Sequence, residues 1–241
     1  MPFDHSLRDA PASKADCIGD PAQRAVMPRA DAGRRLRLVP ISRSAFDKLR
    51  AKHGTYSSWA VWARRDSSER VKAHIDDLSV LDPDVDPGVL DVLRPDVVFL
   101  GLNASSRGKE IEPEPWRNFH DSSRYARDYR IRDALVGTEY WGAFLTDVIE
   151  RFPETSSGLV LRHLRSHPEE VAEHGRRLAE KLDDLGTDDP LLVAFGRATH
   201  RLAQQALGPD RRVIYVTHYS HQVSPEVYRQ SVLEAIRTAA G

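Results

Sequence analysis

Residues 96–108 read Asp96-Val97-Val98-Phe99-Leu100-Gly101-Leu102-Asn103-Ala104-Ser105-Ser106-Arg107-Gly108, an apolar run that ends in small polar residues. The run over residues 97–100 predicts a strand that is buried on both faces, as in a parallel sheet. Open parallel sheets bind ligands beyond the carboxyl ends of their strands. Asn103 lies at such an end, and the small residues after it allow a ligand to approach the backbone. We therefore expect a binding site here.

The composition sets limits on the class of protein. The chain has 241 residues, 40% of them hydrophobic and 29% charged, which is enough for one hydrophobic core. Its formal net charge of -1 means that any binding of nucleic acid must use a local basic surface. The single cysteine, Cys17, excludes an internal disulfide framework and a four-cysteine metal site. No apolar run reaches transmembrane length and no signal pattern begins the chain, so we expect a soluble, cytoplasmic monomer without membrane contacts.

The pattern along the chain predicts the architecture. Residues 1–40 are rich in Pro, Asp, Ala and Arg, which indicates a disordered tail before a single domain over residues 41–241. Short helices are predicted over residues 44–50 and 57–65, with Trp59 and Trp62 on one helix face. Strands are then predicted at 97–100, 140–147, 191–195 and 213–216, and helices at 123–135, 168–185, 198–207 and 225–238. This alternation predicts a three-layer α/β/α domain with a small, mainly four-stranded parallel sheet.

Distinctive polar residues mark three of these strands: Asn103, Asp147 and His218. The carboxyl ends of parallel strands share one edge of a sheet, so the three residues are expected to face one pocket. A charge inside an apolar run is costly without a partner, so Asp147 either belongs to a ligand site or caps a helix or pairs with an arginine. Gly196-Arg197, between a strand and a helix, either holds a phosphate at the helix start or forms a tight turn.

Several motifs follow one another in a recognisable order. They are Gly101-Leu102-Asn103-Ala104-Ser105, the loop residue Phe119, Gly142-Ala143-Phe144-Leu145-Thr146-Asp147, the glycine-ended strand at 191–196, and His218-Tyr219-Ser220-His221-Gln222. In this order the chain resembles the uracil-DNA glycosylase superfamily over roughly residues 97–232. The asparagine at position 103 and the lack of a cysteine set are most similar to its mismatch-specific, cysteine-free branch.

The resemblance implies an enzyme of base excision repair that hydrolyses the N-glycosidic bond of a flipped, damaged or deaminated base in DNA, without a cofactor or metal. It implies that Asn103 orients the attacking water, that Phe119 stacks on the flipped base and that Asp147 reads the base edge. His218 and backbone amides from Leu102 onward are suited to stabilise the charge on the departing base. The residues expected to contact DNA, at phosphates or in the gap left by the base, are Ser105, Arg107, Lys109, Arg197, Tyr219, Ser220, His221 and Gln222.

The chain also departs from the pattern of that superfamily. Ala104 and Tyr219 stand where its first and last motifs usually carry proline. Asp147 stands where its uracil readers usually carry asparagine. An amide both donates and accepts a hydrogen bond, whereas an ionised carboxylate only accepts. Either burial holds Asp147 protonated, or the preferred base presents two donors, as guanine does with N1–H and its amino group.

Two other functions fit the same residues. The altered motifs and neutral net charge are compatible with a catalytically silent module of this fold that binds nucleic acid. A serine hydrolase would use Ser106, Asp147 and His218 in that order, although the two prolines within residues 110–115 disfavour the helix that must follow its nucleophile. His163 and His167 have metal-ligand spacing, but the sequence offers no evident third ligand and Pro168 follows at once. We interpret these two as surface histidines.

Overall fold

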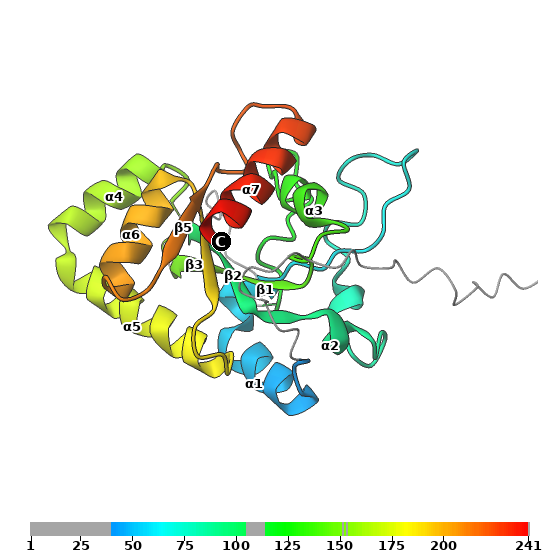
Figure 1. Ribbon diagram of the computed structural model, residues 1–241, viewed down its shortest axis with the longest axis horizontal. Coiled ribbons are helices and arrows are strands. Elements are labelled where there is room, and N and C mark those ends of the chain that lie inside the picture. The colour runs from blue at the N-terminus through cyan, green and yellow to red at the C-terminus, as the bar shows by residue number, and fades with distance from the viewer. Residues whose placement is uncertain (1–39, 105–113, 151, 153, 241) are drawn as a thin grey trace, which may run out of the picture.

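The computed structural model describes residues 40–104, 114–150, 152 and 154–240, which build a five-stranded sheet between two layers of helices (Figure 1). All but Pro40 of the predicted tail lies outside these residues. The strands are β1 Ser57–Trp59, β2 Arg94–Asn103, β3 Ala143–Ile149, β4 Leu191–Phe195 and β5 Val213–Val216. The α-helices are α1 Arg43–His53, α2 Val89–Val92, α3 Tyr129–Leu135, α4 Ser157–Ser166, α5 Pro168–Asp184, α6 Arg197–Leu207 and α7 Pro225–Ala240, with 3₁₀-helices η1 Gly54–Tyr56 and η2 Leu78–Leu81.

The strand order is β1-β3-β2-β4-β5. Strands β3, β2, β4 and β5 are parallel, whereas β1 is antiparallel to β3. The predicted three-layer α/β architecture and its parallel strands are therefore confirmed. The prediction of a mainly four-stranded parallel sheet is wrong in one respect, because the sheet is mixed and has a fifth strand at its edge.

That fifth strand lies where the sequence predicts a helix over residues 57–65. The pairing of β1 with β3 is extended by Ala60, whose N–H donates to the carbonyl of Ala143 at 2.8 Å. In extended backbone, residues three apart point to opposite faces. Trp59 accordingly packs against Phe144 on one face of the sheet, and Trp62 packs against His120 on the other. The two tryptophans therefore do not share a face, and their spacing is no helix signal.

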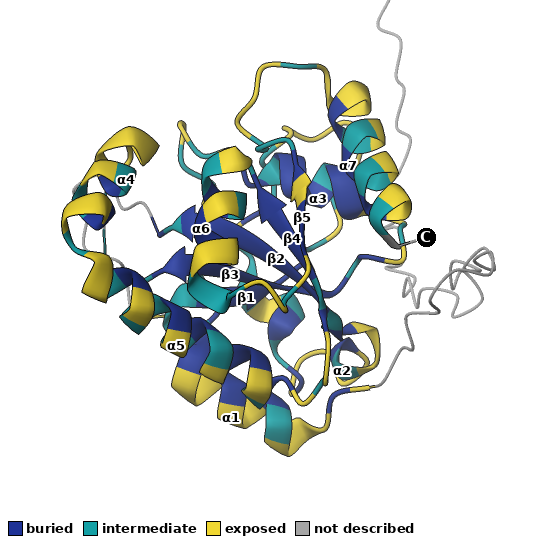
Figure 2. Ribbon diagram, turned by 60° about the vertical axis from the view of Figure 1, so that its left-hand side comes forward, coloured by how far each residue is buried: buried dark blue, intermediate teal, exposed yellow. Residues whose placement is uncertain are grey.

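Each face of the sheet has its own hydrophobic core and its own helices (Figure 2). One core includes Leu100 of β2 and is covered by apolar side chains of α1, α4, α5 and α6. The other includes Phe99 of β2 and is covered by side chains of α3 and α7. Alternation along the buried strand β2 sends successive side chains into different cores, which explains the uninterrupted apolar run.

The helix boundaries follow local signals in most cases. Helices α5 and α7 begin at Pro168 and Pro225, as the sequence predicts. The helix expected over residues 123–135 instead begins at Tyr129. In the turns before it, the Asp121 carboxylate accepts a hydrogen bond from the Ser123 N–H at 2.7 Å. Short polar side chains that bond to nearby backbone in this way compete with helix formation. None of the helices in the described part of the chain is long and apolar enough to cross a membrane.

The topology sets the edge of the sheet at which a ligand site is expected. From β2 the chain passes to β3 on one side, and then returns to β4 on the other side of β2. Loops therefore leave the carboxyl ends of β2 and β4 in opposite directions, which is the switch point at which open α/β sheets bind ligands. Asn103 is the last residue of β2, and Gly196 follows the last residue of β4.

Candidate functional site

One row of residues crosses the four parallel strands on the α3 and α7 face. Asp147 of β3 is in register with Gly101 of β2, and Phe195 of β4 is in register with Val216 of β5. Gly101 lies one step beyond the last pair of β2 and β4, which places it beside Phe195. Along the row, the Asp147 carboxyl comes first, Gly101 lies next to it, and the Phe195 ring lies on the other side of Gly101.

The neighbours of Gly101 leave no room for a side chain at this position. A Cβ at this position would lie 2.1 Å from Oδ1 of Asp147 and 3.1 Å from Cζ of Phe119. The carboxyl and the phenyl ring therefore occupy the space that any other side chain would fill. This juxtaposition, built from β2, β3 and the loop before α3, is the core of the candidate site.

Asp147 is a buried acid inside a strand. The sequence suggests that it ends a strand, but β3 continues to Ile149. Its Oδ2 accepts a hydrogen bond from Nδ2 of Asn118 at 2.8 Å, so the partner is an amide and neither a helix end nor an arginine. Burial raises the pKa of Asp147 to about 7, against the lowering effects of the Asn118 hydrogen bond and the Lys181 charge. The carboxyl therefore changes charge near neutral pH.

The loop that carries Asn118 and Phe119 is anchored by hydrogen bonds to two other segments. The Trp116 N–H donates to the Gly54 carbonyl at 2.9 Å, and Nδ1 of the fully buried His120 is 3.1 Å from the Ile75 carbonyl. Phe119 has a φ of 66°, a left-handed conformation that is uncommon outside glycine. Its side chain is 5% exposed, so the face that would stack on a base is covered in this conformation.

A second buried acid, Asp128, lies near the first and is missed by the sequence analysis. Its Oδ2 accepts a hydrogen bond from the Asp121 N–H at 2.9 Å. Burial raises the pKa of Asp128 to about 7, and the Asp128 charge in turn raises the pKa of Asp147. Burial and these two carboxyls raise the pKa of Tyr219 well above its ordinary value. The site is therefore an acidic, poorly hydrated environment.

His218 follows β5 and is held as a neutral imidazole. Its Nδ1 accepts hydrogen bonds from the Ser220 backbone N–H at 3.1 Å and from the Ser220 hydroxyl at 2.8 Å. Burial lowers the pKa of His218 to about 4. With Nδ1 accepting, the single proton of the neutral ring lies on Nε2, which is left as a donor. Gly196, with a φ of 90°, leaves room for this ring, because a Cβ there would lie 3.3 Å from Cβ of His218.

Tyr219 joins His218 to the row of residues on the sheet. Its ring stacks on His218 at a centroid distance of 4.3 Å and meets Phe195 edge-on at 5.2 Å. Tyr219 is thus half-buried and turned inward, rather than presented for insertion into DNA. Ser220, His221 and Gln222, the other predicted contacts in this loop, are exposed.

Arg130 anchors the exposed loop. Its guanidinium donates to the carbonyls of His221 and Val223, both at 2.7 Å, and lies 5.0 Å from the ring centre of Tyr228. Arg130 is buried, so it fixes the loop from inside and does not face a phosphate. The sequence analysis missed this role, because no local pattern shows which carbonyls an arginine will reach.

Two hydrogen bonds fix the orientation of the Asn103 side chain. Nδ2 donates to the carbonyls of Phe152 and Glu154, both at 2.7 Å. Among the described residues no hydrogen bond reaches Oδ1, which can accept one from water. The side chain of Leu102 points the other way, into the core on the opposite face of the sheet. Only the backbone of Leu102 can therefore line the site, and its side chain does not.

Of the predicted basic contacts, the structure describes Arg197 alone. The Arg197 guanidinium is exposed and lies 5.4 Å from the ring centre of Tyr215. Tyr215 precedes Val216 on β5 and so points to the face opposite the candidate site. Ser105, Arg107 and Lys109, together with Ser106 of the alternative hydrolase triad, lie outside the described residues.

Two further features lie elsewhere. A groove of about 410 Å³ between α5 and α6 is on the sheet face opposite Asp147, and its titratable lining consists of Arg176 and Arg211. We therefore assign it no part in the site. In the described part of the chain, one group of side chains can hold a metal ion, namely His163, His167 and Glu170. Glu170 is the third candidate ligand, which the sequence analysis did not recognise.

Scans against protein-family models, curated proteins and solved structures found no match to this chain. Function therefore has to be argued from the site itself.

Proposed function

We propose that the protein is a DNA glycosylase that hydrolyses the N-glycosidic bond of a flipped base. The observation that carries the proposal is the cluster over Gly101: a buried carboxyl and an aromatic ring together fill the space above this glycine, near the carboxyl ends of the parallel strands. An aromatic surface beside a hydrogen-bonding group is what recognition of an extruded base requires. The motif order in the sequence supports the same reaction.

Asp147 is proposed to select the base through its protonation state. A protonated carboxyl presents one donor and one acceptor, the pair that an amide would offer to O4 and N3–H of uracil. An ionised carboxyl presents acceptors only and suits a base edge with two donors. Because burial raises the pKa of Asp147 to about 7, both states are accessible near neutral pH. We expect uracil-like bases to bind the protonated form.

Asn103 and His218 are proposed to act on the bond that breaks. Water would donate a hydrogen bond to Oδ1 of Asn103, while the two Nδ2 contacts with carbonyls keep the amide in place. An amide does not accept a proton, so the rate must come from electrostatic stabilisation of the departing base. The Nε2–H of the neutral His218 is a fixed donor for that developing negative charge.

A non-catalytic nucleic-acid-binding module is the second candidate. The 5% exposure of Phe119 favours it, because a base can stack there only after the loop moves. A serine hydrolase is not favoured, because a triad requires the acid to bind Nδ1 of the histidine. Here Nδ1 of His218 binds Ser220, and Asp147 binds Asn118.

Base release from labelled oligonucleotides tests the proposal. The panel carries uracil, hypoxanthine, xanthine or an alkylated base, in single strands and in each mismatch. The proposal predicts release of at least one base by the wild-type protein and loss of that release in Asn103→Ala and His218→Ala. DNA binding without release of any base would favour the silent module.

A further inference from the structure

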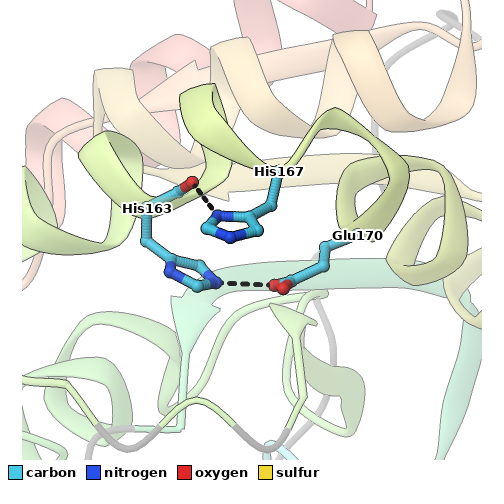
Figure 3. Close-up of side chains that lie close together, drawn as sticks. All are labelled: His163, His167 and Glu170. Carbon is cyan, nitrogen blue, oxygen red and sulfur yellow. Dashed lines mark hydrogen bonds and ion pairs between the residues drawn. The ribbon is translucent and has the colours of Figure 1, made fainter.

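A sharp bend between α4 and α5 brings three metal-ligating side chains together (Figure 3). Helix α4 ends at Ser166 and α5 begins at Pro168, so His167 is the single residue between them. His163 lies on the last turn of α4 and Glu170 on the first turn of α5. The bend folds the first turn of α5 back toward His163, which no helical spacing would achieve.

The hydrogen bonds show which ring nitrogen of each histidine is nearest to the other ligands. Nδ1 of His167 lies 2.9 Å from the carbonyl of His163, and a carbonyl only accepts, so Nδ1 carries the proton and Nε2 has a free lone pair. Metal-binding histidines characteristically use their second nitrogen in this way. Nε2 of His163 lies 2.8 Å from Oε2 of Glu170. One ligand atom from each of the three residues lies within 4.8 Å of the other two.

The two imidazole rings are also held in position. They stack on each other at a centroid distance of 4.2 Å and an angle of 20°. The ring of Phe152 packs on the other side at 4.7 Å from that of His163. Phe152 is itself tied to β2, because its carbonyl accepts a hydrogen bond from Asn103. The rings therefore start close together, but their planes are nearly parallel and their lone pairs lie in those planes, so one ring must turn before both nitrogens can face one ion.

We propose that His163, His167 and Glu170 bind a divalent zinc ion. Two imidazoles and one carboxylate form a zinc donor set, and bond lengths of 2.0–2.2 Å imply ligand separations of roughly 3.3–3.5 Å in a tetrahedral site. Side-chain rotation widens the His163–Glu170 pair and draws His167 inward to reach this geometry. All three residues are partly exposed, so water can supply the fourth ligand. Nitrogen ligands disfavour Mg²⁺, which prefers oxygen.

The chain contains an internal control. Nε2 of His74 lies 2.9 Å from Oε1 of Glu69, a pair of nearly the same length as His163–Glu170 and of similar exposure. His74 and Glu69 belong to no three-ligand group in the described residues. If both pairs are ordinary histidine–carboxylate ion pairs, substituting either histidine should have the same effect on Zn²⁺ binding. If His163 and Glu170 belong to a metal site, only substitution of His163 should weaken Zn²⁺ binding.

Zinc binding by the full chain, stripped of metal with a chelator, tests this proposal. Calorimetric titration with Zn²⁺ is expected to show one site, and Co²⁺ is expected to give the visible absorption of a tetrahedral complex. His163→Ala and Glu170→Gln should each weaken Zn²⁺ binding by more than about 100-fold, the upper end for loss of an outer-shell partner alone. His74→Ala should leave it unchanged. Zn²⁺ at about 100-fold above its Kd should raise the Tm by about 5–10 °C.

Circular dichroism of the metal-free variants verifies that they fold, because the substituted side chains are partly exposed. Excess Mg²⁺ should not displace the bound ion. The proposal is overturned if no Zn²⁺ binds, if binding survives both His163→Ala and Glu170→Gln, or if His74→Ala weakens it equally. None of these measurements involves DNA, so their outcome is independent of the proposed glycosylase activity.

Discussion

The Asp147→Asn variant is predicted to be more stable than the wild-type protein at alkaline pH. The replacing amide can still accept the hydrogen bond that Asn118 donates to Oδ2 at 2.8 Å. The substitution also removes the free-energy cost of burying a carboxylate. That cost is the main reason why the pKa of Asp147 is about 7 in the folded protein instead of 3.8. A difference of roughly three pKa units corresponds to about 4 kcal/mol between the two proteins.

The sign follows from proton binding. Below pH 3.8 the carboxyl is protonated in both the folded and the unfolded chain, and its contribution to wild-type stability is fully present. As the pH rises from 3.8 to the folded pKa of about 7, that contribution is progressively lost, because the unfolded chain ionises more readily. The stability advantage of Asp147→Asn should therefore be about 1–2 kcal/mol at pH 5 and about 4 kcal/mol at pH 8.5.

Chemical denaturation at these two pH values measures the difference. Thermal unfolding should show a Tm increase of about 8–16 °C at pH 8.5 for a domain of this size. Asp91→Asn, on an exposed position of α2, is the matched control and should not show this pH-dependent gain. Because the charges of Asp128 and Asp147 repel each other, removing the Asp147 charge should also ease the ionisation of Asp128 and add to the gain at pH 8.5. An advantage of Asp147→Asn that is equal at pH 5 and pH 8.5, or a loss of stability at pH 8.5, would refute the reasoning.

Three further outcomes are expected. Gly101→Ala should destabilise the protein by about 2–3 kcal/mol in urea unfolding, because its Cβ would lie 2.1 Å from Oδ1 of Asp147; an unchanged midpoint contradicts this packing. Arg130→Ala should free the loop at His221, seen as faster amide hydrogen exchange there and a loss of about 2–4 kcal/mol. His218 should show no NMR titration between pH 5.5 and 8.5, because burial lowers its pKa to about 4; a midpoint near 6.5 would show a solvated ring.

The parallel strands were predictable because burial on both faces leaves a continuous apolar run, as in Phe99 and its neighbours. The edge strand was not predictable in the same way. Its three residues gain their structure from pairing with β3, and the spacing of Trp59 and Trp62 is equally compatible with a helix. Likewise, the start of α3 depends on side-chain contacts of Asp121 that compete with helical hydrogen bonds.

In the candidate site too, local sequence patterns identify some residues, whereas others depend on tertiary packing. A charge inside an apolar run identifies Asp147, and position after a strand identifies His218. Asp128 could not be found in this way, because its burial arises from tertiary packing. Glu170 was missed as a partner of His163 because the chain bends at Pro168, and spacing rules assume one continuous helix.

Base release as a function of pH tests the central claim most directly. The wild-type protein and Asp147→Asn are assayed on the labelled panel at pH 6 and pH 8.5. If the protonated carboxyl recognises a uracil-like base, wild-type release should fall roughly 30-fold between these values, as expected for a pKa of about 7, and Asp147→Asn should change little. A base with two donors should show the opposite trend in the wild-type protein. No release of any base at either pH would contradict the glycosylase account, and identical pH profiles in both proteins would contradict the role of Asp147.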